Sequence, residues 1–126
     1  MYPRNIISWL PTFIFTLLVS LGTYADQSSS IPAPSVWENK SGSTLQIDSI
    51  ASDGLMTGSY INRAAGYGCQ NISYPVTGWA DGTALTFNTL WESIAESCNS
   101  ITAWAGLLDQ GQISSLWNLT INGSTS

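Results

Sequence analysis

Short runs in which apolar and polar side chains alternate fill the chain beyond residue 35. Clusters of Gly, Asp, Asn and Ser separate these runs at spacings typical of an antiparallel meander, and no stretch carries a convincing helical period. Seven strands are predicted, at residues 36–39, 44–50, 55–62, 74–80, 83–91, 100–108 and 112–121. Most connections are short hairpin signals such as Asp81-Gly82, but the loops around Cys69 and Cys98 are longer. The pattern therefore predicts an all-β fold with both cysteines at one end of the sheet.

Strand alternation also predicts which side chains share a face. Trp91, Trp104 and Trp117 lie on three successive predicted strands at positions that can point into one interior. Packing in a core is the ordinary explanation for a buried tryptophan. Ser100 and Thr102 share the face of Trp104, however, and a dry core rarely tolerates hydroxyl groups without partners. A ligand cavity therefore competes with simple core packing.

The first 35 residues differ from the rest of the chain. Arg4 precedes an apolar run over residues 6–21, and the small-residue end at Ala25 favours a secretory signal peptide over residues 1–25. A membrane anchor is the alternative, since about 20 apolar residues can span a bilayer. Residues 26–35 are polar and contain two prolines, which predicts a flexible leader. One domain is expected over residues 36–126, in a secreted or periplasmic protein without membrane contact once the signal is removed.

Charge excludes some functions. Removing residues 1–25 leaves Lys40 and Arg63 as the only cations against eight carboxylates, so nucleic acid is not expected as a partner. The chain has no histidine, no Gly-rich phosphate loop and no spacing typical of metal ligands, which argues against an enzyme, a metal site and a cofactor. Glu92 and Glu96 could form an acid–base pair, but solvated charges explain them equally simply.

Two further features concern the cysteines and the last residues. An even cysteine count in an exported chain predicts one disulfide, with two buried thiols as the alternative. Asn122-Gly123 is a strong hairpin signal, yet only three residues follow it. We therefore expect an eighth strand to be missing from the printed sequence, which would leave a barrel with two open edges.

With these elements placed, the chain resembles the avidin family, and within it the dimeric bacterial avidins such as rhizavidin. The resemblance extends over residues 36–123. It is carried by WENKSGSTL at 37–45, TGSYINRA at 57–64, GCQN and YPVTG within 68–78, ESCNSITAWAG at 96–106 and SLWNL at 115–119. It implies an eight-stranded antiparallel up-and-down barrel, here lacking its eighth strand, that binds biotin non-covalently and with high affinity at its open end. Biotin would be a ligand, and no cofactor is implied.

The resemblance also implies roles for individual residues. Asn39, Ser43 and Tyr60 would donate hydrogen bonds to the ureido oxygen, as preorganised donors do in an oxyanion site. The remaining implied contacts are Asn62 with a ureido N–H, Trp91, Trp104, Trp117 and Leu119 with the rings, Thr102 with the thioether sulfur and Ser100 with the valerate carboxylate. Trp37 matches a family position but is expected in the core at the barrel floor.

The matched cysteines and the missing strand have their own implications. Cys69 and Cys98 match the pair that joins two site loops in dimeric members, which implies a disulfide and a homodimer with sites complete within one chain. The absent strand would remove one wall and the acceptor of the second ureido N–H. We therefore expect the printed residues alone to bind biotin poorly or to fold poorly.

Two other functions remain open at this stage. A secreted carbohydrate-binding module with several tryptophans would need an exposed Trp platform. An avidin-like barrel could also bind another small ligand, although the intact set of Asn39, Ser43 and Tyr60 argues against that loss.

Overall fold

The structure, a computed structural model, describes residues 1–3 and 30–123 as one antiparallel sheet whose strands follow chain order. The strands are β1 (Tyr2–Pro3), β2 (Ser35–Glu38), β3 (Thr44–Ile50), β4 (Leu55–Ile61), β5 (Ser73–Asp81), β6 (Ala84–Leu90), β7 (Ser100–Asp109) and β8 (Gln112–Ile121). Strands β2–β8 are the seven predicted strands, and the part of the chain that the structure describes contains no helix. The predicted all-β fold is therefore confirmed.

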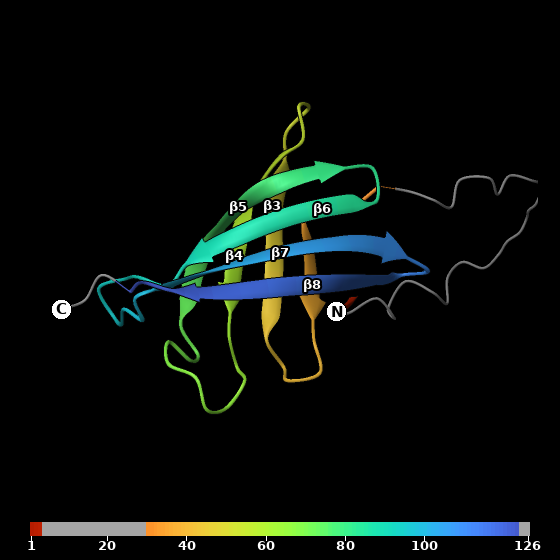
Figure 1. The fold of residues 1–126 in the computed structure, drawn as a ribbon. Coiled ribbons are helices and arrows are strands. Elements are labelled where there is room, and N and C mark those ends of the chain that lie inside the picture. The colour runs from red at the N-terminus through yellow and green to blue at the C-terminus, as the bar shows by residue number, and fades with distance from the viewer. Residues whose placement is uncertain (4–29, 124–126) are drawn as a thin grey trace, which may run out of the picture.

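The sheet curls into a cup, so that β6, β7 and β8 pass across β2, β3 and β4 (Figure 1). Two glycines permit the close approach of neighbouring strands. A Cβ atom on Gly58 would overlap the carbonyl of Gln46 on β3, and one on Gly78 would overlap the carbonyl of Thr86 on β6. Only a residue without a side chain fits at these positions.

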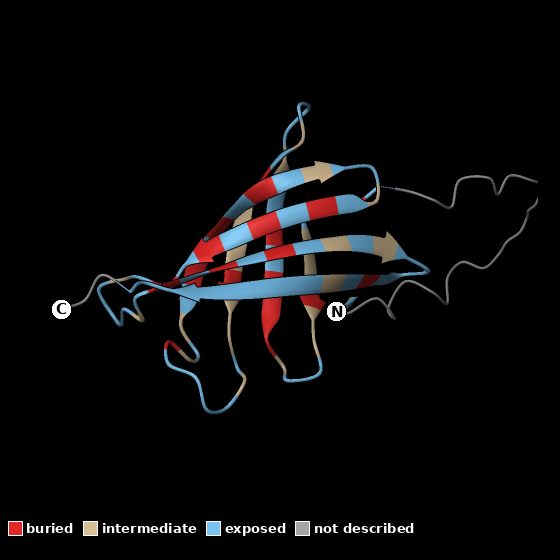
Figure 2. Cartoon of the chain, in the orientation of Figure 1, coloured by how far each residue is buried: buried red, intermediate tan, exposed pale blue. Residues whose placement is uncertain are grey.

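Alternation along the strands fills the inside of the cup with apolar side chains. The pattern is clearest on β6, where buried and exposed residues alternate throughout, and on β5 up to Trp79 (Figure 2). The buried apolar residues of the strands include Trp37, Leu45, Ile47, Met56, Tyr74, Val76, Leu85, Phe87 and Ile113. Trp37 is 3% exposed, as expected for a core residue, and its Nε1 donates to Ser35 Oγ at 2.9 Å.

The predicted hairpin between β7 and β8 forms with a two-residue turn. Asp109 pairs with Gln112, and the intervening Gln110 and Gly111 have φ angles of 53° and 78°. Two successive positive φ angles characterise the turn that suits the right-handed twist of hairpin strands. This turn fixes the register of β8, and thereby places Trp117 directly opposite Trp104.

The two-residue strand β1 was not predicted. It pairs with β2, and Met1 joins the other end of the sheet, because its ammonium group donates to Ile113 O at 2.7 Å and its carbonyl accepts from Ile113 N at 3.0 Å. Among the described residues, β8 beyond Ile113 pairs only with β7. Most of its side chains are accordingly exposed.

The expected signal peptide and leader fall mostly on residues 4–29, which lie outside the described residues, so both stay predictions. Within the leader, Ile31 is described: it is buried, and its N–H donates to Gly82 O at 2.9 Å. A search of the described residues finds no helix long and apolar enough to cross a membrane.

Candidate ligand-binding site

A cavity of about 580 Å³ occupies the cup at the end where the long loops meet. Nine of the ten residues expected to contact a ligand line it, namely Asn39, Tyr60, Asn62, Trp91, Ser100, Thr102, Trp104, Trp117 and Leu119. The tenth, Ser43, is 2% exposed and lies behind this lining, with its Oγ 3.4 Å from Asn62 Oδ1. The structure therefore brings all ten together around one space.

Asn39 follows the end of β2 and is held by its own turn. Its Oδ1 accepts the backbone N–H groups of Ser41 and Ser43, each at 3.0 Å. Because these two donors occupy the amide oxygen, the orientation of the amide is fixed and its Nδ2 group remains free to donate. Asn39 therefore presents a hydrogen-bond donor to the cavity.

Ser43 immediately precedes β3, and its side chain is also oriented as a donor. Its Oγ accepts the backbone N–H of Arg63 at 2.8 Å. A hydroxyl whose oxygen already accepts a strong hydrogen bond directs its proton elsewhere, and the nearest acceptor is Asn62 Oδ1 at the long distance of 3.4 Å. The Ser43 hydroxyl is thus a weakly used donor beside the cavity.

Tyr60 on β4 supplies a third donor, its phenolic hydroxyl, to the cavity. Its side chain is 5% exposed, and burial raises the pKa of the phenol, with a partly offsetting effect from a hydrogen bond with Ser43. The phenol therefore keeps its proton at neutral pH and can donate.

Asn62 lies just past the end of β4. Its Oδ1 accepts the N–H of Ala64 at 3.1 Å, which fixes the side chain. A carbonyl oxygen has two acceptor sites, and the second receives only the long 3.4 Å hydrogen bond from Ser43, which a ligand N–H can replace.

Aromatic rings form the opposite wall. Trp104 stacks on Phe87 with centroids 4.6 Å apart and contacts Tyr60 at 4.7 Å, while Trp91 meets Tyr74 edge to face at 5.1 Å. Trp91 and Trp104 are 7% and 6% exposed. These contacts lock both rings in place, so the wall is rigid before any ligand arrives.

Trp117 and Leu119 differ from the buried tryptophans. Both line the cavity, yet they are 56% and 39% exposed. The reason is their place on β8, where the described residues provide no further strand to cover them. The three tryptophans therefore line one cavity, as predicted, but Trp117 faces it from an open edge and is not buried.

Two hydroxyls lie between the polar and aromatic parts. Thr102 Oγ1 accepts a 2.8 Å hydrogen bond from Trp91 Nε1, so its own proton is available. Ser100 is 8% exposed and lines the cavity one step along the same face of β7. Both can therefore offer donors near the cavity mouth.

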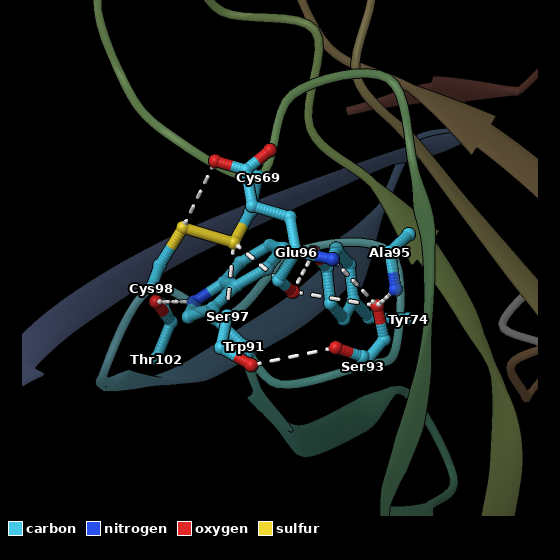
Figure 3. Close-up of a disulfide and its surroundings, with 9 residues drawn as sticks. All are labelled: Cys69, Tyr74, Trp91, Ser93, Ala95, Glu96, Ser97, Cys98 and Thr102. Carbon is cyan, nitrogen blue, oxygen red and sulfur yellow. Dashed lines mark hydrogen bonds between the residues drawn. A yellow bond between two sulfur atoms is a disulfide. The ribbon is translucent and has the colours of Figure 1, made fainter.

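The predicted disulfide is confirmed between Cys69 and Cys98, and it joins the β4–β5 loop to the β6–β7 loop. Figure 3 shows the bridge beside Trp91 and Thr102. Tyr74 Oη donates to Glu96 O at 2.8 Å, which ties the β6–β7 loop to β5 (Figure 3). The two loops at the mouth are thus bonded to each other and to the sheet.

Glu92 and Glu96, the only acid–base pair considered, are both exposed. A carboxylate oxygen of Glu96 lies 3.9 Å from the Cys98 sulfur, outside the aromatic part of the cavity. Neither carboxylate lines the cavity. This geometry gives no support to hydrolysis by a carboxylate pair.

Sequence reasoning missed several lining residues, of which Tyr67 is the largest. Tyr67 is 56% exposed and lies at the mouth in the loop that Cys69 anchors. An aromatic residue between two glycines, two positions before a bridged cysteine, was a usable signal for it. Met1 and Ser115 also line the cavity, but nothing in their local sequence distinguishes them.

Comparison with known proteins identifies related chains. A model of the avidin family matches residues 27–126. Afifavidin from Afifella pfennigii is 34% identical over 105 residues, which cover 79% of this chain and 65% of afifavidin. The chain thus spans just under two thirds of that relative.

Solved structures give the same result. The structure of apo shwanavidin matches with a TM-score of 0.72 and 57% identity over 76% of this chain and 85% of that one. A rhizavidin–biotin complex matches with a TM-score of 0.67 and 42% identity over 75% of this chain and 81% of that one. Each similarity covers about three quarters of this chain.

Proposed function

The chain belongs to the avidin family, and from that premise we propose that it binds biotin non-covalently in the cavity at the open end of its cup. One observation carries the proposal: the acceptor atoms of Asn39 and Ser43 are already occupied by backbone N–H groups. Together with the protonated Tyr60, three donors remain for one acceptor. The ureido oxygen of biotin is such an acceptor, and rhizavidin, at 42% identity, has been solved in complex with biotin.

Preorganised donors explain how such a site gains affinity. Partial negative charge on the ureido oxygen is held better by fixed dipoles in a water-poor cavity than by water, which must reorganise around it. Asn39, Ser43 and Tyr60 occupy this role in the proposal. When Ser43 donates to the ureido oxygen instead of to Asn62 Oδ1, Asn62 accepts one ureido N–H at the site that Ser43 vacates.

The rest of the ligand fits the remaining lining. Trp91 and Trp104 pack on the bicyclic ring, and Trp117 and Leu119 cover it from β8. Thr102 directs its hydroxyl proton to the thioether sulfur, and Ser100 donates to the valerate carboxylate. Rigid aromatic walls supply contact area at low entropic cost.

Binding without catalysis is part of the proposal. The exposed Glu92 and Glu96 leave the cavity without a carboxylate, and its donors are neutral groups. We also place the protein in an exported compartment, because the Cys69–Cys98 bridge requires oxidising conditions.

A homodimer is proposed through the outer face of β4–β8. Leu55, Trp79 and Leu116 are between 40% and 81% exposed and lie around the small residues Ala103 and Ala105. Contiguous apolar side chains of this size mark an interaction surface. Sedimentation equilibrium should give a dimer, and Trp79→Glu should shift it to monomer without loss of biotin binding.

Calorimetric titration with biotin tests the main proposal, with tryptophan emission as a second readout. We expect one biotin per chain and quenching of Trp91 and Trp104 emission. A soluble glucan is the matched negative ligand, because a carbohydrate-binding module would respond to it instead. Quenching by the glucan but not by biotin would replace the proposal with that alternative.

A further inference from the structure

We infer that Arg63 is a positioning residue that holds Ser43 as a hydrogen-bond donor toward the ligand. The inference rests on the proposed biotin site and assigns a role to a cation that lies beside its donors. Arg63 lies just past β4, next to Asn62, and does not itself line the cavity. It acts on three consecutive residues of the β2–β3 turn.

Each of the three contacts is a hydrogen bond donated by Arg63. Its backbone N–H donates to Ser43 Oγ at 2.8 Å. Its Nη1 donates to Gly42 O and to Thr44 Oγ1, both at 3.0 Å. The guanidinium thus hydrogen-bonds to the residues on either side of Ser43, and the backbone N–H donates to the Ser43 oxygen.

The residues around Arg63 help to hold these hydrogen bonds in place. Gly42 has a φ angle of +86°, and a Cβ at that position would meet the Arg63 side chain at 4.0 Å, so the stem of Arg63 packs along the turn. Thr44 is 6% exposed, which shields its hydrogen bond from water. The carbonyl of Arg63 accepts a hydrogen bond from Gln70 Nε2 at 3.2 Å, which links Arg63 to the loop of Cys69.

A turn that carries two ligand donors gains little from hydrophobic packing, because its neighbours are polar. Asn39 orients the turn from within through its Oδ1 atom. Arg63 fixes the same turn against the end of β4, which carries Tyr60. Charge-assisted hydrogen bonds have the strength to keep the two donor-bearing segments in register.

A thermodynamic cycle on the full chain tests this role. Biotin affinity is measured by calorimetry for the parent, Arg63→Met, Ser43→Ala and the double variant. We expect Arg63→Met to weaken binding about tenfold in the parent and less than about twofold in the Ser43→Ala background. An equal loss in both backgrounds, or no loss in the parent, would overturn the inference.

Further variants separate positioning from charge and from folding. Arg63→Lys can still donate to Gly42 O and Thr44 Oγ1, so it should recover affinity to within about threefold of the parent. Lys40→Met removes a positive charge from the same turn and should leave binding unchanged; an equal loss there would overturn the inference. If Arg63→Met does not fold, Thr44→Val replaces it in the cycle, because it removes one acceptor of the guanidinium and keeps the shape of the side chain.

The outcomes distinguish this inference from the proposed function. A parent chain that does not bind biotin overturns the proposed function and the inference together. A parent that binds biotin while Arg63→Met and Thr44→Val bind equally well overturns the inference alone.

Discussion

Trp91 Nε1 donates a 2.8 Å hydrogen bond to Thr102 Oγ1, and this single bond joins the aromatic wall of the cavity to its polar side. Both side chains are buried. The bond holds the plane of the indole and leaves the Thr102 proton pointing away from it. Several expected results depend on bonds of this kind.

Thr102→Val should destabilise the protein. The substitution leaves the buried Trp91 Nε1 without an acceptor, which costs about 1–3 kcal/mol in the free energy of unfolding. Biotin binding should weaken as well, because the ring loses its fixed orientation. Chemical denaturation and calorimetry measure the two effects, and Thr102→Ser, which keeps the acceptor, should behave like the parent.

Thr89→Val should have the opposite sign. Thr89 is 1% exposed, and among the described residues its Oγ1 has no hydrogen-bond partner. Replacing an unsatisfied buried hydroxyl with a methyl group of the same shape should leave stability unchanged or raise it by about 1 kcal/mol. A loss of stability similar to that of Thr102→Val would show that the hydroxyl has a partner in solution.

Removing the disulfide should affect both stability and ligand release. The bridge closes a loop with a sequence separation of 29, for which the chain-entropy relation gives roughly 3.6 kcal/mol. The Cys69→Ala/Cys98→Ala variant should unfold at lower denaturant concentration and release biotin faster, since the mouth loops then need ordering. Stopped-flow release of a fluorescent biotin gives the rate; equal rates with and without the bridge would contradict this.

Alkaline pH should abolish the contribution of the Tyr60 phenol to folding stability and to biotin affinity. Burial raises its pKa in the folded protein, so the folded state holds the phenolic proton more tightly than the unfolded chain does. This contribution is therefore complete below the ordinary tyrosine value of about 10 and is lost as the pH rises through the higher folded pKa. Biotin affinity should stay constant up to about pH 10 and then fall, whereas Tyr60→Phe should bind more weakly at neutral pH and show no such alkaline loss.

Local pattern predicted most of the sheet. Alternation and turn residues suffice for strands that have a neighbour on both sides, such as β5 and β6, because each side chain is either in the cup or outside it. The same reasoning gave the face of Trp117 but not its exposure, since exposure on β8 depends on whether a further strand covers it and not on alternation. Strand β1 was missed because two residues are too few to show an alternating pattern.

The candidate site, like the fold, could be predicted only in part. Resemblance identified nine of the residues that line the cavity, but it said nothing about the atoms that orient them. Arg63 was read only as one of two cations, and its three hydrogen bonds depend on how the β2–β3 turn meets the end of β4. Contacts between segments about 20 residues apart have no local signature in a single sequence.

Gly58 and Gly78 affect the size of the cup although neither lines the ligand cavity. A methyl group at either position would push its neighbouring strand outward and flatten the bend of the wall. The space available to a ligand thus depends partly on two positions of β4 and β5 that have no Cβ atom. Attempts to adapt the cavity to a bulkier ligand should therefore keep both glycines and change the residues that line it.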